Sequence, residues 1–312
     1  MIGAAGYIAP RHMKAILETG NNLVAAYDPY DGIGILDSYF PECSFFKEFE
    51  RFDRYLEKLK RVEKKVVDFI VITSPNYLHD SHIRYGLRIG SNVICEKPIV
   101  LNPHNLEQLI EIEKESTFKV FNILQLRLHP DVIKLKKIIE NDIRENQQKV
   151  YDIDLTYITS RGKWYFSSWK GEEAKSGGIT TNIGIHFFDM LTWIFGGIIK
   201  NEVYYRESDT SSGFLKLKNA NVRWFLSTNN KFLDKKNKRT FRSILMNSVE
   251  FEFSKGFENL HTLSYQNILK NEGFGLNEAK NSLNVVAEIR NKKISKMNKN
   301  KSHPMLKKIL NE

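Results

Sequence analysis

The sequence has few of the features that mark secreted, disulfide-stabilised or membrane-spanning proteins. Its 312 residues include only two cysteines, Cys43 and Cys95, which are too few for a disulfide framework in a chain without secretory features. No apolar run approaches the roughly 20 residues that span a bilayer, and the N-terminus lacks the order of a signal peptide. These absences predict a cytoplasmic protein with reduced thiols and no membrane partner.

The sequence also has few acidic residues relative to basic ones, and its formal net charge is +10. Much of this charge lies between residues 290 and 308, RNKKISKMNKNKSHPMLKK. This stretch has no clear apolar period, which predicts a solvated or partly disordered tail. Because the excess is so local, we do not expect nucleic acid as a partner. A moderately basic body also suits an anionic small substrate.

Short apolar runs alternate with longer amphipathic stretches up to residue 128, which indicates βαβ units around a parallel sheet. The expected strands cover 23–27, 66–73, 93–95 and 120–126, and the expected helices cover 10–19, 52–63, 78–89 and 103–115. After a helix over 131–140, alternating strands are expected at 149–159, 201–206, 213–218, 222–227 and 240–253. We therefore predict an α/β fold: a doubly wound parallel sheet over 1–128, an α+β domain with a mainly antiparallel open sheet over 129–290, and a basic tail over 291–312.

The stretch GAAGYI, residues 3–8, matches part of the GxGxxG pattern of a dinucleotide-binding turn. Gly3 is the first glycine, Ala5 and Ile8 stand at the other two positions, and Gly6 lies between them. The proline that follows can begin a helix whose amides face a phosphate. Asp28 ends the next strand, where an acid favours NAD over NADP. The turn alone is equally typical of a plain small-residue turn, and the context favours a nucleotide site.

Polar side chains follow two further predicted strands. Ser74 and Asn76 come after the strand over 66–73, and Glu96 and Lys97 come after the strand over 93–95. Ligands bind at this edge of open α/β sheets, and a lysine there can polarise a hydroxyl and stabilise alkoxide charge. The alternatives are helix capping for Ser74 or Asn76 and a solvated surface position for Lys97.

The segment SGGITTNIGIHFFDML begins with a flexible glycine pair and continues as an apolar helix. Its polar residues Asn182, His186 and Asp189 are spaced four and three apart, which places them on or near one helical face. A histidine beside a nicotinamide can remove a hydroxyl proton as hydride leaves the carbon. The alternatives are a core histidine and a metal site, and the metal site lacks ligands because Asn182 is a poor zinc ligand.

Together the strings GAAGYIAPRH, AAYDP, TSPNYLH, CEKP and NIGIHFFD resemble the Gfo/Idh/MocA oxidoreductases, in the order expected for them. Within that family, RGKWYFSSWK, SGGITTNIGIHFFDML and LHTLSYQNIL are similar to the dehydrogenases that oxidise the 3-hydroxyl of UDP-2-acetamido-2-deoxyglucuronate with NAD, on the route to lipopolysaccharide and O-antigen sugars. The resemblance implies an N-terminal Rossmann-like domain, NAD as cofactor, and a homotetramer assembled through the exposed face of the second sheet.

The resemblance also implies roles for individual residues. Lys97 would orient the hydroxyl and stabilise its charge, His186 would be the catalytic base, and Asn182 would stand beside the sugar, where many relatives have Asp. The residues implied for NAD binding are Gly3, Ala5, Gly6, Tyr7, Ile8, Asp28 at the ribose, Ser74, Asn76, His79, Glu96 on the nicotinamide side, Lys97, Gln125 and Trp169. Those implied for substrate binding are Arg127, Arg161, Lys163, Tyr165, Asn182 and His186.

The implied substrate carries a pyrophosphate and a carboxylate. Arg161, Lys163, Lys170 and Lys175 could pair with these groups, or with 2-oxoglutarate, which some relatives use to reoxidise the cofactor. Their alternative is a solvated basic loop. Trp164 and Trp169 would wall the nicotinamide pocket or, alternatively, anchor a surface loop.

Two other functions stay open on the sequence alone. One is an inositol or simple-sugar dehydrogenase of the same family, against which the string RGKWY argues. The other is a redox-inactive protein that binds NAD or a sugar nucleotide, which a short N-terminus and Asn182 both permit.

The implied fold begins with a strand before the glycine turn, whereas only Met1 and Ile2 precede Gly3. That strand would lie in the middle of the sheet, and its loss would expose two neighbouring strands. Either the true start lies upstream of Met1, or the chain is a decayed copy with weak cofactor affinity; the intact strings downstream favour the first. We expect a chain that begins at Met1 to be poorly stable.

Overall fold

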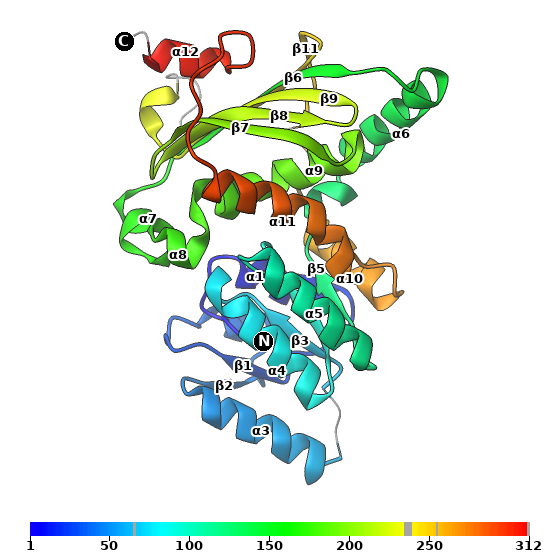
Figure 1. Ribbon diagram of the computed structural model, residues 1–312. Helices are drawn as coiled ribbons and strands as arrows, with labels where there is room; N and C mark the ends of the chain where they lie inside the picture. The colour runs from blue at the N-terminus through cyan, green and yellow to red at the C-terminus, as the bar shows by residue number, and fades with distance from the viewer. Residues whose placement is uncertain (65–66, 234–238, 254, 311–312) are drawn as a thin grey trace. The chain divides into compact units, whose positions relative to one another are not determined.

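The computed structural model describes residues 1–64, 67–233, 239–253 and 255–310 (Figure 1). The chain divides into two compact units, the first formed by Met1–Gln125 with Asn259–Lys280 and the second by Leu126–Glu258 with Asn281–Glu312. Several predicted positions lie outside the described residues: Val66 of an expected strand, residues 234–238 and 254 of the expected second domain, and the last two residues of the expected tail.

The sheet of the first unit is parallel throughout. Its strands are β1 (Ala25–Tyr27), β2 (Ser44–Phe46), β3 (Phe69–Ile72), β4 (Asn92–Cys95) and β5 (Val120–Asn122). The strand β1 pairs with β2, and β3, β4 and β5 pair in that order. Ile2 forms single parallel bridges to Tyr27 and Ile72, so Met1 and Ile2 fill the place of a strand between β1 and β3. Both flanking strands therefore have a backbone partner there.

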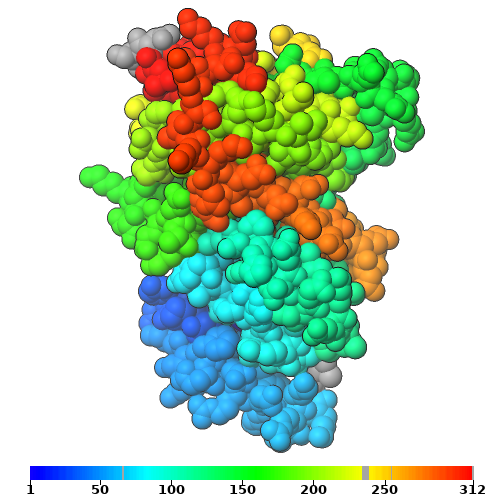
Figure 2. Space-filling model, in the orientation of Figure 1, coloured from blue at the N-terminus to red at the C-terminus, as the bar shows by residue number. Residues whose placement is uncertain are grey.

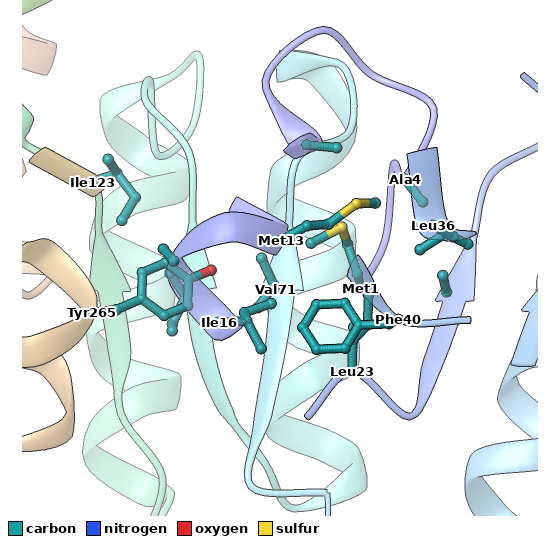
Figure 3. Close-up of a cluster of buried hydrophobic side chains, with 14 of the residues drawn as sticks. Met1, Ala4, Met13, Ile16, Leu23, Leu36, Phe40, Val71, Ile123 and Tyr265 are labelled. Carbon is teal, nitrogen blue, oxygen red and sulfur yellow. The ribbon is translucent and has the colours of Figure 1, made fainter. Parts of the chain in front are cut away.

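Helices cover both faces of this sheet, as a doubly wound fold requires. On one face, α1 (Ala9–Glu18), α2 (Ile35–Tyr39) and α10 (Leu260–Leu269) share an apolar cluster with Val71, Ile94 and Phe121 (Figure 3). On the other face, α4 (His79–Ile89) lies so close that a Cβ at Gly86 would be 2.6 Å from Val93 Cγ2. The remaining helices are α3 (Phe49–Arg61) and α5 (Pro103–Glu115).

Residues 259–280 belong to the first unit, whereas the sequence pattern placed them in the second domain. Helix α10 contributes Tyr265 and Ile268 to the apolar cluster of the first unit. Beyond the helix, Asn122 N–H of β5 donates to Phe274 O at an N–O distance of 2.7 Å. The returning segment thus completes the core over α1 and pairs with the end of the last strand, which a linear reading of domains does not reveal.

The sheet of the second unit has the order β11-β10-β6-β9-β8-β7. Its strands are β6 (Tyr151–Thr159), β7 (Ile198–Arg206), β8 (Thr210–Leu217), β9 (Ala220–Ser227), β10 (Thr240–Met246) and β11 (Val249–Glu250). Every neighbouring pair is antiparallel except β6 with β9, which confirms the mainly antiparallel sheet. Helix α9 (Ile185–Phe195) packs on one face, where Phe188 meets Trp224 edge to face at 5.5 Å.

The C-terminal segment packs against the opposite face of this sheet, contrary to the expectation of a solvated tail. Leu306 of α12 (Pro304–Leu310) is fully buried in a cluster with Phe214 and Phe225, and Figure 2 shows this segment lying over the strands. His303 bonds Thr156 Oγ1 at 3.0 Å. The sequence pattern concealed this packing, because the apolar residues are few and stand among lysines.

The other helices of the second unit are α6 (Pro130–Glu145), α7 (Lys163–Ser167) and α8 (Glu173–Ser176), and α11 (Leu276–Asn291) begins in the first unit. Among the described residues, no helix is both long enough and apolar enough to cross a membrane.

Candidate active site

The glycine turn at the start of the first unit has the form of a phosphate-binding loop. Gly3 has a φ of +94°, and a Cβ there would be 2.5 Å from Ser74 N, so only glycine fits both the conformation and the space. Within the described part of the chain, the peptide N–H groups of Tyr7 and Ile8 have no hydrogen-bond acceptor. They precede α1, whose N-terminus carries partial positive charge. These donors fit the pyrophosphate of a dinucleotide.

Asp28 supports this turn from the end of β1. One carboxylate oxygen accepts from the peptide N–H of Ala5 at 3.0 Å, and the other accepts from Tyr30 N–H at 3.0 Å. The carboxylate is mostly buried, so its first role is to hold the loop in place. Its predicted contact with the adenosine ribose uses the lone pairs that remain, and stays a prediction.

Two histidines contact Ser74, which follows β3. Ser74 Oγ lies 2.9 Å from His82 Nδ1. His79 is 1% exposed, and its ring nitrogens lie 2.7 Å from Pro98 O and 2.9 Å from Ser74 O. Burial lowers the pKa of His79. With both ring nitrogens directed at backbone carbonyls, His79 links two strand ends, and its expected contact with the cofactor stays a prediction.

Glu96, which follows β4, is buried in the interior of the first unit, where its carboxylate contacts two histidines. Its Oε1 lies 3.0 Å from both His12 Nε2 and His261 Nε2, and its Oε2 accepts from the peptide N–H of Lys97 at 3.1 Å. Burial by itself would raise the pKa of Glu96, but the hydrogen bonds with the two histidines hold it well below its usual range. Glu96 therefore supports the backbone of Lys97, and its expected place on the nicotinamide side stays a prediction.

Lys97 is half-buried, and the peptide bond to Pro98 is cis. Asn76 is buried in the turn Asn76–Leu78, and Gln125 is half-buried in the turn Gln125–Leu128. Direct contacts of these residues with NAD stay predictions.

In the second unit, Asn182 and His186 lie where a π-helical turn, Thr180–Gly184, leads into α9. The turn approaches the sheet closely, since a Cβ at Gly184 would be 2.6 Å from Leu226 Cδ1. Both side chains are half-buried. Asn182 Nδ2 donates to the hydroxyl of Tyr165 at 2.8 Å. Tyr165 is 3% exposed, so it serves to orient the Asn182 amide.

Arg127 and Asp189 form a buried bidentate ion pair. Arg127 Nε and Nη2 donate to the two oxygens of Asp189 at 2.9 and 2.7 Å. Burial raises the pKa of Asp189, and Arg127 opposes that shift. Arg127 was expected to bind substrate, but both side chains are less than a tenth exposed. The pair anchors α9 instead, because the carboxylate needs a charged partner when buried.

The basic loop between β6 and α9 is open to solvent in part. Arg161 and Lys163 are exposed, and Trp164 is 57% exposed. Lys170 lies over both tryptophans, with Nζ 5.6 Å from the Trp164 ring centre and 4.4 Å from the Trp169 ring centre. The ammonium and the rings thus form one cation–π group, while contact with a ligand stays a prediction.

Sequence reasoning missed three residues of the first unit: His12, His261 and Tyr265. Two signals could have found them. His12 lies in the first turn of α1, directly after the glycine loop, at a buried position within an apolar face. His261 and Tyr265 stand four apart in LHTLSYQNIL, the spacing of neighbours on a helix.

The chain matches two family models over most of its length. Residues 1–123 match the NAD-binding Rossmann fold of the GFO_IDH_MocA oxidoreductase family, and residues 136–234 match the C-terminal alpha/beta domain of that family. The chain belongs to this family. It is an NAD-dependent oxidoreductase, and the phosphate loop described above provides the donors that the cofactor requires.

Among solved structures, the WlbA (WbpB) dehydrogenase of Thermus thermophilus is 47% identical, with a TM-score of 0.91 over 97% of this chain and 98% of that one. It was crystallised with NAD and alpha-ketoglutarate, and with NAD and UDP-GlcNAcA. The WlbA dehydrogenase of Bordetella pertussis shares the fold, at 19% identity and a TM-score of 0.73 over 92% of each chain.

A curated relative, the inositol 2-dehydrogenase of Rhizobium meliloti (strain 1021), is 27% identical over 131 residues, which are 42% of this chain and 37% of that protein. The chain spans well under half the length of the curated relatives that it matches.

Proposed function

We propose that this protein oxidises the 3-hydroxyl of UDP-2-acetamido-2-deoxyglucuronate to the 3-keto sugar nucleotide with NAD. The observation that carries the proposal is the 47% identity, over 97% of the chain, to a dehydrogenase crystallised with NAD and UDP-GlcNAcA. At that identity nearly half of the aligned residues are the same in the two chains, in addition to the fold. The polar residues of the π-helical turn and α9 agree with the proposal, because they offer an amide and an imidazole in half-buried positions.

The proposed chemistry assigns one task to each side chain. NAD supplies the hydride acceptor. Lys97 Nζ donates a hydrogen bond to the reacting oxygen and stabilises the negative charge that develops there. The imidazole of His186 removes the hydroxyl proton while hydride leaves the sugar carbon, a task suited to a group that titrates near neutral pH. Asn182, held by Tyr165, orients the sugar and carries no charge of its own.

The basic loop is proposed to recognise the charged parts of the substrate. Arg161 and Lys163 are exposed and form no ion pair with a carboxylate among the described residues, which suits them to phosphate or carboxylate oxygens. The same cations would accept 2-oxoglutarate, whose reduction to 2-hydroxyglutarate would take hydride from NADH and a proton from the enzyme. The complex of the Thermus relative with alpha-ketoglutarate supports this recycling.

We further propose that the product feeds the synthesis of lipopolysaccharide or O-antigen sugars and that the enzyme is a homotetramer. The sheet face through which relatives were expected to assemble carries α12 here, so an interface at that position would include the C-terminal segment. Light scattering on the purified protein measures the subunit number directly.

The experiment that tests the proposed reaction combines the purified protein with UDP-2-acetamido-2-deoxyglucuronate, NAD and 2-oxoglutarate. We expect the 3-keto sugar nucleotide by mass spectrometry, together with 2-hydroxyglutarate. A parallel assay with myo-inositol and with simple sugars measures the competing activity. Oxidation of those compounds in place of the UDP-sugar would overturn the proposal, and NAD binding without turnover of any of them would indicate a binding protein.

A further inference from the structure

Four buried polar side chains from three separate segments form one connected cluster inside the first unit. His12 lies on α1, Glu96 directly precedes Lys97, and His261 and Tyr265 lie on α10. The contacts are His12 Nε2 to Glu96 Oε1 at 3.0 Å, His261 Nε2 to the same oxygen at 3.0 Å, and His12 Nδ1 to the Tyr265 hydroxyl at 2.8 Å. All four residues are less than a tenth exposed.

With Glu96 ionised and His12 neutral, the donors and acceptors of this cluster have a single assignment. An ionised Glu96 carboxylate accepts and cannot donate, so both histidines must carry hydrogen on Nε2. Burial lowers the pKa of His12, which keeps its ring neutral, and a neutral ring has a single N–H. His12 Nδ1 is therefore an acceptor, and Tyr265 must donate to it.

The carboxylate is held in its charged form by this arrangement. Glu96 accepts N–H groups from His12, His261 and the backbone of Lys97, and three such bonds offset the desolvation of a buried carboxylate. Burial also raises the pKa of Tyr265 well above its usual range, so its hydroxyl keeps the proton that it donates. The three hydrogen-bonding nitrogens and oxygens from His12, Glu96 and His261 lie within 4.8 Å of one another, close enough for a cation, but the assignment is complete with protons alone.

The cluster joins three parts of the nucleotide site. Helix α1 carries the phosphate loop at its N-terminus, the segment after β4 carries Lys97, and α10 returns from the far end of the sequence. The link to Lys97 is direct, because Glu96 Oε2 accepts the peptide N–H of Lys97. A change of tautomer at His12 would remove one donor from Glu96 and loosen that link.

We propose that His12, His261 and Tyr265 are positioning residues that act through Glu96 to fix the backbone of Lys97 and so aim its ammonium group. The proposal rests on the proposed function of Lys97 at the reacting hydroxyl. None of the three touches substrate in this scheme. They set the orientation of a side chain that does, in the way that residues behind a metal ligand orient the ligand.

The test compares two substitutions that each remove one hydroxyl from a buried tyrosine of the first unit. Tyr265→Phe deprives His12 of its donor. Tyr85→Phe is the matched control, because the Tyr85 hydroxyl donates to Asp53 at 2.9 Å on α3, outside the nucleotide site. We expect Tyr265→Phe to lower kcat by about 10-fold with little change in NAD affinity, and Tyr85→Phe to leave kcat within about 2-fold. Equal effects of the two substitutions on kcat would overturn the proposal.

A second pair of variants separates positioning from packing. His261→Gln keeps an N–H donor at the position of Nε2, whereas His261→Leu keeps the volume and removes the donor. We expect Gln to retain most of the kcat that Leu loses, at similar melting temperatures. If kcat follows the melting temperature across both variants, the residue is structural only and the proposal fails.

Two measurements do not depend on turnover, so they distinguish failure of this inference from failure of the proposed function. Imidazole ¹⁵N spectra of the wild-type protein should show hydrogen on Nε2 of both His12 and His261 and a neutral ring at His12, and Tyr265→Phe should shift only the His12 tautomer. Metal analysis should find less than stoichiometric metal in the purified protein. A different tautomer at either ring, or a bound metal ion lost in His261→Leu, would contradict the network.

Discussion

The two compact units hold their candidate catalytic side chains in different ways. In the first unit, Lys97 is fixed through its backbone by a carboxylate that accepts from two imidazole N–H groups and one peptide N–H. In the second, His186 stands on α9, and that helix is anchored by a buried pair of full charges, Arg127 and Asp189. A network of imidazole and hydroxyl donors depends on which atoms carry the protons, whereas a charge pair depends on both partners being present. A single carboxylate-to-amide substitution should therefore lower the free energy of unfolding by different amounts in the two units.

The largest expected effect is the loss of either candidate catalytic group. Lys97→Ala and His186→Ala should each lower kcat by about 10²- to 10⁴-fold, because each removes a group that interacts with the reacting hydroxyl. NADH formation with the UDP-sugar measures this. Added imidazole should restore part of the rate in His186→Ala and none in Lys97→Ala, which separates the two roles. If either variant keeps more than about a tenth of the wild-type kcat, its side chain does not act in the chemistry.

The next largest effect contrasts the buried charge pair with the neutral network. Asp189→Asn leaves the Arg127 guanidinium buried without a counter-charge, so the free energy of unfolding should fall by about 3–5 kcal/mol. Glu96→Gln keeps an oxygen that can accept from the two imidazole N–H groups and should cost about 1–3 kcal/mol. Urea unfolding of both variants gives the comparison. An exposed pair, Lys114 with Glu111, supplies the control, where Glu111→Gln should cost less than about 1 kcal/mol. Equal losses for Asp189→Asn and Glu96→Gln would refute the distinction.

The smallest expected effect is a pH dependence shared by both units. Burial lowers the pKa of His82 in the first unit and of His303 in the second to about 4. Each ring is neutral in the folded protein and protonates near pH 6.5 when unfolded, so the unfolding free energy should be constant above that pH and fall as the pH drops toward 4. Each histidine should contribute about 1–3 kcal/mol at the acid end.

Unfolding curves of His82→Gln and His303→Gln between pH 4 and 7.5 measure this contribution residue by residue. Each substitution should flatten the pH dependence of the unfolding free energy by its own share. An unchanged slope in both variants would show that other groups cause the acid loss.

The elements that were predicted well are those whose side chains follow a simple period. Helix α5 was expected over 103–115 and spans Pro103–Glu115, and the strands of the second sheet were found close to their expected places. Lys97, His186 and the glycine turn were likewise proposed from local motifs, and their roles stay predictions. All of these signals come from residues close together in the sequence, so they can be recognised without knowledge of the fold.

The features that could not be predicted depend on contacts between distant parts of the chain. The partners of Glu96 lie 84 and 165 residues away, and no spacing rule connects them. Arg127 and Asp189 each carry a charge that suits a ligand equally well, and only their shared burial shows that they satisfy one another. The packing of Leu306 was hidden by the lysines around it.

The return of α10 to the first unit has a consequence for how this protein can be divided. A fragment that ends before residue 259 would lack His261, Tyr265 and Ile268, and would expose the apolar side chains that they cover. A chimera that exchanges the second half of the chain for that of another relative would also exchange part of the interior of the first half. An exchange of the first unit between relatives should therefore include both of its segments, Met1–Gln125 and Asn259–Lys280.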